Sequence, residues 1–320
     1  MSAKKNLYKS VFIIICLFIT ALLCLKTEIR TRFKMGTFVD ITLAGFVWDD
    51  FDSVFNNAFI AIDGVEQIAD MYDTGSELSR LNKTAHVGPF RVSEELFFMI
   101  YNADQLNRES EGVFDITIAP IAALWKLCIQ NKMLPDDRDI KDNLVLTGGG
   151  NIALDPNSRE VFFKKNGMRI DLGAVAKGYA VDRAAGEIRR SGIRSAMINA
   201  GGDIFCIGKK GPLSPWRIGI RDPYDKKNVC AAISLSDKAA ATSGGYEQFF
   251  VCEGRYYSHL IDPRNGYPVI GEYSSVTVIA GSCFFADAFA TAIFVGGEQA
   301  KNKLLSLYPD IEVVTIKNNF

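Results

Sequence analysis

The pattern of apolar and polar residues divides the chain into helical and extended segments. Apolar side chains recur at helical spacing in residues 50–71 and again in residues 94–108, so both stretches predict amphipathic helices. Residues 37–43 alternate between apolar and polar and predict a strand. From residue 195 onward strands are expected at 195–199, 203–207, 216–221, 229–235, 246–252, 255–261 and 275–280, followed by helices at 283–295 and 298–308 and a strand at 311–316.

Helices and strands are grouped in blocks and do not alternate regularly. This grouping is typical of an α+β fold with a largely antiparallel sheet and packed helices. A hairpin is expected where residues 151–154 and 160–164 flank an Asp-Pro-Asn-Ser turn. Residues 112–120 form a short apolar segment that fits a strand or a loop. The charged stretch 131–143 is the only candidate seam in the chain.

Residues 170–182 combine a turn, a helix start and two charged side chains. A strand is expected to end at Ile170, and a helix is expected to open near Ala174. The unpaired backbone N–H groups of this helix start would face Asp171 and Lys177, which suits a phosphate. The structural alternative is that Asp171 caps the helix and Lys177 is a solvated side chain.

Length and composition allow a large buried core. The chain has 320 residues, 48% of them hydrophobic, enough for one large domain or two closely packed lobes. Basic and acidic residues are balanced at 36 and 37, and no basic run occurs outside the amino terminus, so no nucleic-acid surface is indicated. The expected partner is a small molecule or another protein.

The amino terminus has the plan of an export signal. The apolar run 11–25 lies between lysines on one side and basic residues on the other. It is shorter than the roughly 20 residues of a full span, but it fits a short signal-anchor. Cys24 is a candidate for lipidation, although Leu23 stands where a small residue is usual. Cleavage, lipidation and retention stay open, and we assign residues 1–34 as a signal or membrane anchor and 35–320 as the domain.

Seven cysteines are present, five of them beyond the amino-terminal segment. They are widely spaced, no Cys-x-x-Cys pair occurs, and most lie inside apolar runs. This distribution predicts small core residues and argues against a disulfide framework or a zinc site.

Asp287 and Thr291 lie four residues apart on a predicted helix. They therefore share a face, and a carboxylate and a hydroxyl can present hard oxygens to Mg²⁺. The structural alternative is that the threonine bonds back to a helix carbonyl and the aspartate complements the helix dipole.

The stretch 257–268 concentrates a base, an acid and a cation at His259, Asp262 and Arg264. Loops on a rigid sheet often carry catalytic side chains, which favours a functional role. An Asn-Gly turn between two prolines, with Asp262 and Arg264 only stabilising the loop, fits equally well.

Two stretches of small residues can bring a ligand close to the backbone. Residues 199–203 contain paired glycines but lack a dinucleotide fingerprint, and a bulge or tight turn between strands is the alternative. Residues 240–246 predict a loop whose two hydroxyls cradle a phosphate or simply turn the chain. His86 has no acidic or thiol neighbours in the sequence and is expected at the surface.

Nine blocks of the sequence, in order and with fitting spacing, resemble the ApbE family of flavin transferases. The resemblance runs from Met35 to about Val314. The blocks are 35–37; Tyr72 with 76–82; 112–120 with 124–125; 170–182; 199–203; 216–223; 242–244 with Tyr246; 258–268; and 286–291.

The resemblance implies a single large α+β domain of T-fold-like architecture and an exported, Mg²⁺-dependent enzyme. Such an enzyme binds FAD, cleaves its pyrophosphate, and transfers FMN to a Thr or Ser hydroxyl of an acceptor protein, releasing AMP. Acceptors in the family include membrane subunits of sodium-pumping NADH:quinone oxidoreductase (Nqr) and of Rnf-type complexes. The protein is accordingly expected at the outer face of the cytoplasmic membrane or in the periplasm.

The resemblance also implies a set of site residues. The metal would be held by the carbonyl of Ala174 and the side chains of Asp287 and Thr291. His259 is the candidate base for the acceptor hydroxyl, because imidazole titrates near neutral pH. FAD would touch Met35, Tyr72, Val113, Phe114, Asp115, Asp171, Lys177 and the segment from His259 to Ile261.

Two departures from the family pattern lie beside the loops expected to face the acceptor. Gly245 stands where a polar residue is frequent, and Asn265 where threonine is common, so partner choice is expected to differ. Two other functions stay open: an FAD pyrophosphatase that releases FMN and AMP without an acceptor, and a non-catalytic FAD carrier at the cell surface.

Overall fold

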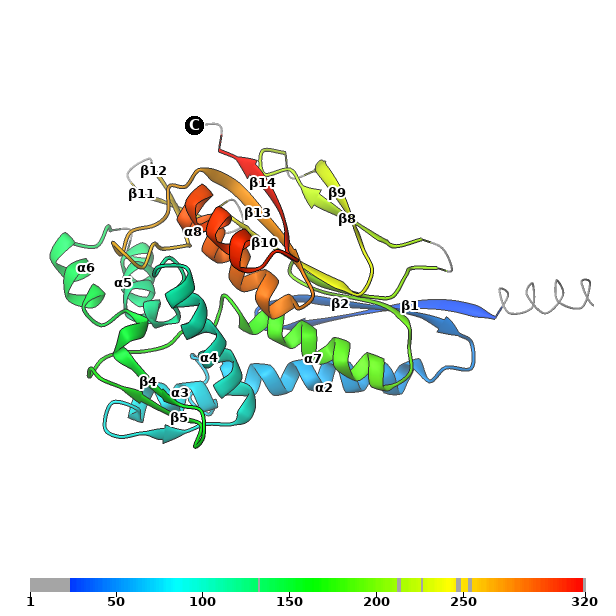
Figure 1. The fold of residues 1–320 in the computed structure, drawn as a ribbon, viewed down its shortest axis with the longest axis horizontal. Helices are drawn as coiled ribbons and strands as arrows, with labels where there is room; N and C mark the ends of the chain where they lie inside the picture. Colours follow the sequence, from blue (N-terminus) through cyan, green and yellow to red (C-terminus); the bar gives the residue numbers. More distant parts are fainter. Residues whose placement is uncertain are drawn as a thin grey trace, which may run out of the picture.

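The computed structural model describes residues 24–131, 133–211, 214–225, 227–245, 249–252 and 255–318 (Figure 1). The apolar run expected to be an export signal lies, up to residue 23, outside the described residues, and so does Tyr246. Within the described ranges, no helix combines the length and the apolar character needed to cross a bilayer.

A seven-stranded sheet forms the centre of the fold. Each strand is hydrogen-bonded antiparallel to its neighbours, which confirms the expected antiparallel core. The strands, in order across the sheet, are β1 (Leu25–Lys34), β2 (Thr37–Phe46), β6 (Ser195–Ala200), β7 (Asp203–Ile207), β10 (Lys238–Gly244), β13 (Tyr273–Ala280) and β14 (Glu312–Lys317).

β1 consists of residues that we assigned from the sequence to the amino-terminal segment. Its ten residues pair with β2 in unbroken register, and the two strands are joined by a tight turn at Met35 and Gly36, where φ is 51° and 72°. The sheet therefore begins ten residues before Met35. Cations of β1 lie 4.1–4.4 Å from phenylalanine rings of helix α2 (Phe51–Ala69): Lys26 over Phe51, Arg30 over Phe55 and Arg32 over Phe59.

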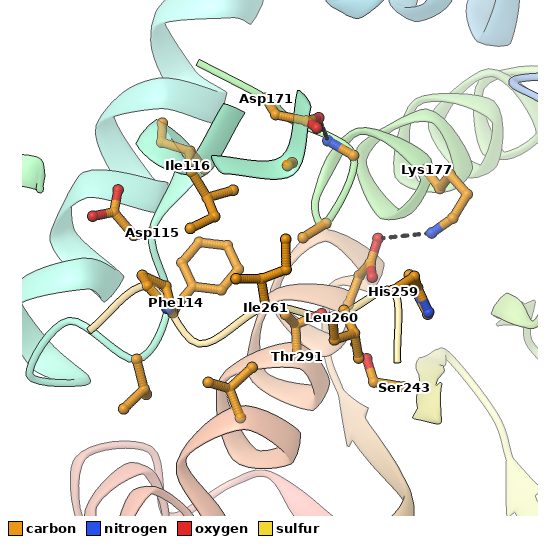
Figure 2. Close-up of a pocket in the computed structure, with 18 of the residues that line it drawn as sticks. Phe114, Asp115, Ile116, Asp171, Lys177, Ser243, His259, Leu260, Ile261 and Thr291 are labelled. Carbon is orange, nitrogen blue, oxygen red and sulfur yellow. Dashed lines mark hydrogen bonds and ion pairs between the residues drawn. The ribbon is translucent and has the colours of Figure 1, made fainter. Parts of the chain in front are cut away.

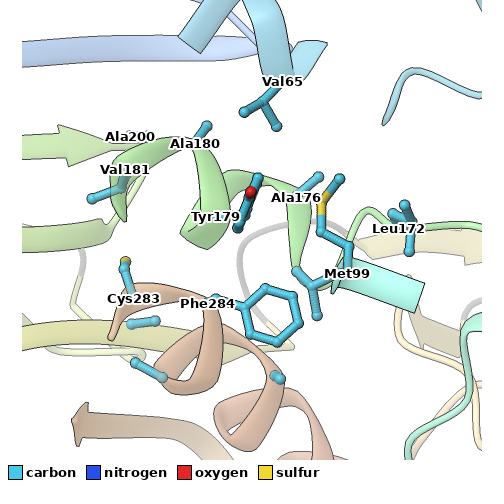
Figure 3. Packing of buried hydrophobic residues seen from close by; sticks show 14 of the residues in the cluster. Val65, Met99, Leu172, Ala176, Tyr179, Ala180, Val181, Ala200, Cys283 and Phe284 are labelled. Carbon is cyan, nitrogen blue, oxygen red and sulfur yellow. The ribbon is translucent and has the colours of Figure 1, made fainter. Parts of the chain in front are cut away.

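One face of the sheet is covered by α2, α7 (Ala176–Arg190) and α8 (Cys283–Leu307). Figure 3 shows α7 between the other two helices, with Tyr179 of α7 near Phe284 of α8 and with Val65 of α2 on the opposite side. α7 and α8 approach closely at Gly178, where a Cβ atom would lie 2.4 Å from the carbonyl oxygen of Cys283.

The other face is covered in part by a hairpin of β8 (Trp216–Arg221) and β9 (Val229–Leu235). Trp216 and Leu235 from this hairpin are buried in a second, smaller apolar cluster. The remaining members of the cluster come from three strands of the sheet: Ile204, Cys206, Ala240 and Ile279.

A helical lobe lies beside the sheet and shares the main hydrophobic cluster with it. Its helices are α3 (Glu77–Thr84), α4 (Glu94–Glu109), the 3-10 helix η1 (Ile116–Ile118), α5 (Ala119–Gln130), α6 (Asp137–Leu144) and the 3-10 helix η2 (Gly149–Asn151). A small sheet in the order β3 (Phe90–Arg91), β5 (Glu160–Phe163), β4 (Ile152–Asp155) and a hairpin of β11 (Phe249–Cys252) and β12 (Arg255–Ser258) complete the described elements.

Several local predictions were wrong. Residues 240–246 were expected to form a loop, but most of them belong to β10, whose alanines are buried in clusters on both faces of the sheet. Residues 112–120 form neither a strand nor a simple loop, because they contain η1 and the start of α5. The charged stretch after residue 131 contains α6, a surface helix capped by Asp136 that buries only Ile140.

One further boundary differs from expectation. No strand ends at Ile170: its backbone N–H and C=O instead bond to the side chain of Asn82, at 2.8 and 2.9 Å. The break expected between helices 283–295 and 298–308 is confirmed, because α8 is interrupted at Gly297 by φ 65° and ψ −151°.

Candidate functional site

A cavity of about 340 Å³ lies where η1, α7, β10 and α8 meet (Figure 2). The loop that follows β12 completes its wall. The cavity combines an apolar side with a side rich in oxygen and charge. Its polar and charged lining residues are Asp115, Asp171, Lys177, Thr242, Ser243, His259, Asp287 and Thr291.

Asp182, in the middle of α7, fixes the start of α8. Its carboxylate accepts hydrogen bonds from the backbone N–H groups of Cys283 and Phe284, at 2.8 and 2.9 Å, and from the Ser282 hydroxyl at 2.6 Å. Burial raises the pKa of Asp182, and these three bonds act against that effect. Because a capped helix start has a defined direction, this contact also sets the position of Asp287 in the second turn of α8.

Lys177 and Asp287 line the cavity and form a charged cluster with Asp203. The lysine Nζ lies 2.7 Å from Asp203 Oδ2 and 3.4 Å from Asp287 Oδ2, and the Gly178 N–H donates to Asp287 at 3.3 Å. Burial disfavours the lysine charge, but the two carboxylates outweigh burial and raise the pKa of Lys177. Burial and the neighbouring Asp203 raise the pKa of Asp287. With all three groups ionised, the cluster carries one net negative charge.

Asp203 was missed as a site residue from the sequence. It is the first residue of β7 and follows the Gly201 and Gly202 turn of a β-hairpin, where φ is 62° and 107°. The turn confirms the structural alternative for residues 199–203. The available signal was a single carboxylate opening an otherwise apolar strand, which is unusual unless it is paired.

Thr291 lies one helical turn after Asp287, and both line the cavity as their spacing predicted. The Thr291 hydroxyl is 3.1 Å from the Ser243 hydroxyl of β10. β10 therefore supplies the two hydroxyls that we expected from residues 240–246, but from a strand end and not from a loop.

The apolar side of the cavity is built around Phe114. Figure 2 shows its ring between Ile116 and Ile261, with Val113 and Val295 also in the lining. The adjacent Asp115 accepts bonds from the N–H and hydroxyl of Thr117 at 2.8 and 2.6 Å, and so it caps η1. Burial raises the pKa of this carboxyl group.

Asp171 does not cap α7. Its side chain accepts the Gly173 N–H at 2.8 Å, and its own N–H donates to Ile116 O at 2.8 Å. α7 begins at Ala176, two residues later than expected, without a side-chain cap. Asp171 thus connects the residues just before α7 to η1. Burial raises the pKa of Asp171.

His259, Ile261 and the intervening Leu260 line the cavity, but Asp262 and Arg264 do not. Asp262 accepts a two-pronged ion pair from Arg264, with Nε to Oδ1 at 2.9 Å and Nη2 to Oδ2 at 2.7 Å. Residues 259–261 therefore line the cavity, whereas Asp262 and Arg264 stabilise the turn that follows.

Two of the expected FAD contacts lie away from this cavity. The Met35 N–H donates to Glu66 Oε1 at 2.7 Å in the turn between β1 and β2. Tyr72 is exposed and lines an adjoining cavity of about 270 Å³, where the Lys126 Nζ lies 4.2 Å from its ring centre. The two cavities share Asp171 and Ala122. All the other expected site residues, including Ala174, lie together at the first cavity.

The described residues contain no group of three or more His, Cys, Asp or Glu side chains placed to hold a metal ion. The ligand set implied by the resemblance is of another kind, with one carboxylate, one hydroxyl and one backbone carbonyl. Asp287, Thr291 and Ala174 all line the cavity.

Comparison with known proteins gives consistent matches over most of the chain. The FAD:protein FMN transferase of Klebsiella pneumoniae (strain 342) is 30% identical over 269 residues, covering 84% of this chain and 83% of that protein. The enzyme of the same name from Vibrio cholerae is 34% identical over 241 residues, covering 73% and 72%.

Solved structures share the fold as well. An ApbE protein from Thermotoga maritima superposes with a TM-score of 0.83 at 31% identity, covering 91% of this chain and 94% of that one. Flavin transferase ApbE from Vibrio cholerae superposes with a TM-score of 0.82 at 29% identity, covering 92% and 95%. The sequence profile of the ApbE family matches residues 35–315. The chain belongs to the ApbE family.

Proposed function

We propose that this chain is an FAD:protein FMN transferase, which moves FMN from FAD to a Ser or Thr hydroxyl of an acceptor protein. The observation that carries this proposal is the cavity lined by Lys177 and Asp287 on its polar side and by Phe114 on its apolar side. The relatives named FAD:protein FMN transferase support it, as does the shared fold with flavin transferase ApbE. The chain is therefore a transferase.

The shape and chemistry of the cavity suit a dinucleotide that combines flat apolar rings with a pyrophosphate. Its volume of about 340 Å³ lies within the usual range for ligand sites. The adjoining cavity, with Tyr72, Lys126 and Arg169, adds an aromatic ring and two cations next to the shared Asp171. We propose that FAD extends through both, with its pyrophosphate near Lys177.

Mg²⁺ fits the polar wall of the cavity. When Asp287 is ionised, the buried cluster carries one net negative charge that is costly to keep out of water, and a divalent cation would offset that charge. Asp287, Thr291 and the carbonyl of Ala174 would hold the ion through hard oxygens, the ligands that Mg²⁺ prefers. When bound, the ion would neutralise negative charge on the phosphates.

In the proposed reaction, the acceptor hydroxyl oxygen forms a bond to the phosphorus on the flavin side of FAD. The bond from that phosphorus to the bridging oxygen breaks, and AMP leaves with this oxygen and the electron pair. His259 accepts the hydroxyl proton, because an imidazole at the cavity wall is suited to take a proton near neutral pH. Lys177 keeps its positive charge through neutral pH, since its raised pKa maintains it, and stabilises the phosphate charge.

We also propose that the amino-terminal segment before β1 places the enzyme at the outer face of the cytoplasmic membrane. The apolar run 11–25 with its flanking basic residues supports this location. Candidate acceptors at such a site are membrane subunits of Nqr- and Rnf-type redox complexes, as the resemblance implies.

Co-expression of the full chain with one such subunit tests the transfer. We expect a flavin-fluorescent band that survives denaturation, and a mass increase of one FMN on a Ser or Thr peptide of the acceptor. Release of AMP from FAD at the same rate with and without the acceptor would instead identify a pyrophosphatase.

A further inference from the structure

The β1 and β2 strands expose an apolar strip on the side that faces away from α2. Residues directly opposite in an antiparallel pair share a face, and the even-numbered side chains of β1 contact α2, so its odd-numbered side chains point away. We define the aromatic face as the six large residues of this strip, each between 37% and 66% exposed: Leu25, Ile29, Phe33, Phe38, Phe46 and Trp48.

The aromatic face is ordered and long. Phe33 and Phe38 pack edge to face with ring centres 5.4 Å apart, and Trp48 stacks on Phe46 with ring centres 4.7 Å apart. In the register of the two strands these ring pairs are separated by eight residues, or about 27 Å at the usual rise of a strand. In Figure 1, α2 and α7 run along the opposite side of β1 and β2, so no helix covers this strip among the described elements.

We propose that the aromatic face rests on the surface of a lipid bilayer. Phe and Trp side chains favour the boundary between headgroups and acyl chains, where their rings are partly desolvated. The inference rests on the membrane attachment proposed above. A second copy of the chain, paired along the free edge of β1, is the rival occupant.

The connection to the amino-terminal run favours the bilayer. The apolar sequence 11–25 leads directly into β1, and the carbonyl of Cys24 accepts a hydrogen bond from the Val47 N–H at 2.8 Å. This bond holds the end of the apolar run beside Trp48, the neighbour of Val47. If the apolar run 11–25 is anchored in the bilayer, one end of the aromatic face therefore lies at the membrane surface, because no linker separates the two.

The charges around the aromatic face fit the same occupant. Exposed Arg194, Lys209 and Lys210 line a shallow groove together with Leu25, which places cations where anionic headgroups lie. Asp40 lies within the strip and accepts from the Thr31 hydroxyl at 2.5 Å. A carboxylate at this position favours shallow contact with headgroups over deep insertion.

Tryptophan fluorescence can test the contact, since Trp48 is the exposed one of the three tryptophans; Trp125 and Trp216 are 4% and 3% exposed. The full chain is reconstituted in vesicles of phosphatidylcholine and phosphatidylglycerol, with and without bromine on the acyl chains. We expect brominated vesicles to quench part of the emission. The substitution Trp48→Phe should abolish that quenched part.

The double variant Phe33→Ser, Phe38→Ser should reduce the quenching, because it removes one end of the aromatic face. Ile60→Ser, an exposed apolar residue on α2, is the matched control and should leave it unchanged. Circular dichroism checks that each variant keeps the fold.

Equal Trp48 emission in the two kinds of vesicle, with the chain bound to both, would overturn the inference and leave the attachment standing. A chain that stays out of the vesicle fraction would overturn both. Dimers that dissociate in the Phe33→Ser, Phe38→Ser variant while Trp48 remains unquenched would assign the face to a second copy. FMN transfer to an acceptor is measured separately and does not depend on these outcomes.

Discussion

At the scale of single residues, Lys177 shows what a sequence can and cannot give. Its place near a helix start was readable, and so was the pairing of Asp287 with Thr291 on one helix face. The ion-pair partner of Lys177 is Asp203, which lies 26 residues further along the chain in a hairpin. This contact depends on how the sheet packs against α7. Local spacing predicts which side chains share an element, but not which elements meet.

Replacing Asp287 by Asn should abolish most of the transfer while the fold remains. The amide oxygen of asparagine can still accept the Gly178 N–H. The substitution removes the carboxylate that is proposed to hold Mg²⁺, and with it the charge that Asp287 brings to the cluster. We expect a rate loss of about 10²–10³, the usual effect of losing one electrostatic group at a reacting centre. AMP release and thermal unfolding measure the two effects. Asp142→Asn, at an exposed position of α6, is the control, and equal activity in both variants would contradict the assignment.

Replacing His259 by Gln should slow transfer more than it weakens FAD binding. A residue that takes the hydroxyl proton acts on the chemical step, where its loss costs roughly 10²–10⁴ in rate. Single-turnover rates with the acceptor measure the chemical step, and flavin fluorescence measures the Kd for FAD. A change in Kd that accounts for the whole loss would make His259 a binding residue only.

The cysteines should differ in reactivity. Cys206 and Cys283 are buried, as expected from the sequence. Cys230 is exposed and Cys128 and Cys252 are partly exposed, so the core prediction was wrong for these three. Burial raises the pKa of Cys206 to about 12, which keeps it a thiol at pH 8. We expect a thiol reagent at pH 8 to label Cys230 in the native protein and Cys206 only after unfolding. Native labelling of Cys206, mapped by mass spectrometry, would argue against this packing.

At the scale of elements, periodicity found the long amphipathic helices and failed where small residues carry the structure. α2 and α4 lie within one or two residues of their predicted bounds. β10 was missed because its run of alanines has no alternation, since the strand is buried on both faces. α3 and α5 were not predicted either, and both pack in the lobe that forms the apolar side of the site.

Two glycines of α7 should respond oppositely to the same substitution. Gly178→Ala places a methyl group 2.4 Å from the Cys283 carbonyl and should cost about 1–3 kcal/mol by forcing α7 and α8 apart. Gly186 has open space around its Cβ position, so Gly186→Ala should stabilise by about 0.4–1 kcal/mol through helix propensity. Urea unfolding of the pair measures both. The same change in the free energy of unfolding for both variants would show that α7 and α8 can move apart at Gly178 without cost.

At the scale of the whole molecule, the helical lobe and the sheet share one hydrophobic cluster. The α+β class and the antiparallel sheet followed from the sequence because strands and helices are grouped in blocks. The sequence did not predict that lobe and sheet share one core. The charged stretch after residue 131 has the composition of a connector between domains, but it forms α6.

The shared cluster predicts a single unfolding transition. Trp125 reports on the lobe and Trp216 on the second apolar cluster of the sheet. In the Trp48→Phe variant, which keeps both of these tryptophans, their emission should change in one transition with a single urea midpoint. Separate midpoints would show that lobe and sheet are independent folding units.

The position of α7 links ligand occupancy to the stability of the entire chain. One end of this helix lies at the cavity wall through Lys177, and its middle holds the start of α8 through Asp182. A ligand that binds the first turn of α7 therefore stabilises two of the three helices that cover this face of the sheet. A ligand that binds only the folded chain adds about 2.7 kcal/mol at one hundred times its Kd. A thermal melt can consequently serve as a binding assay, ranking nucleotides and metal ions before any acceptor protein is known.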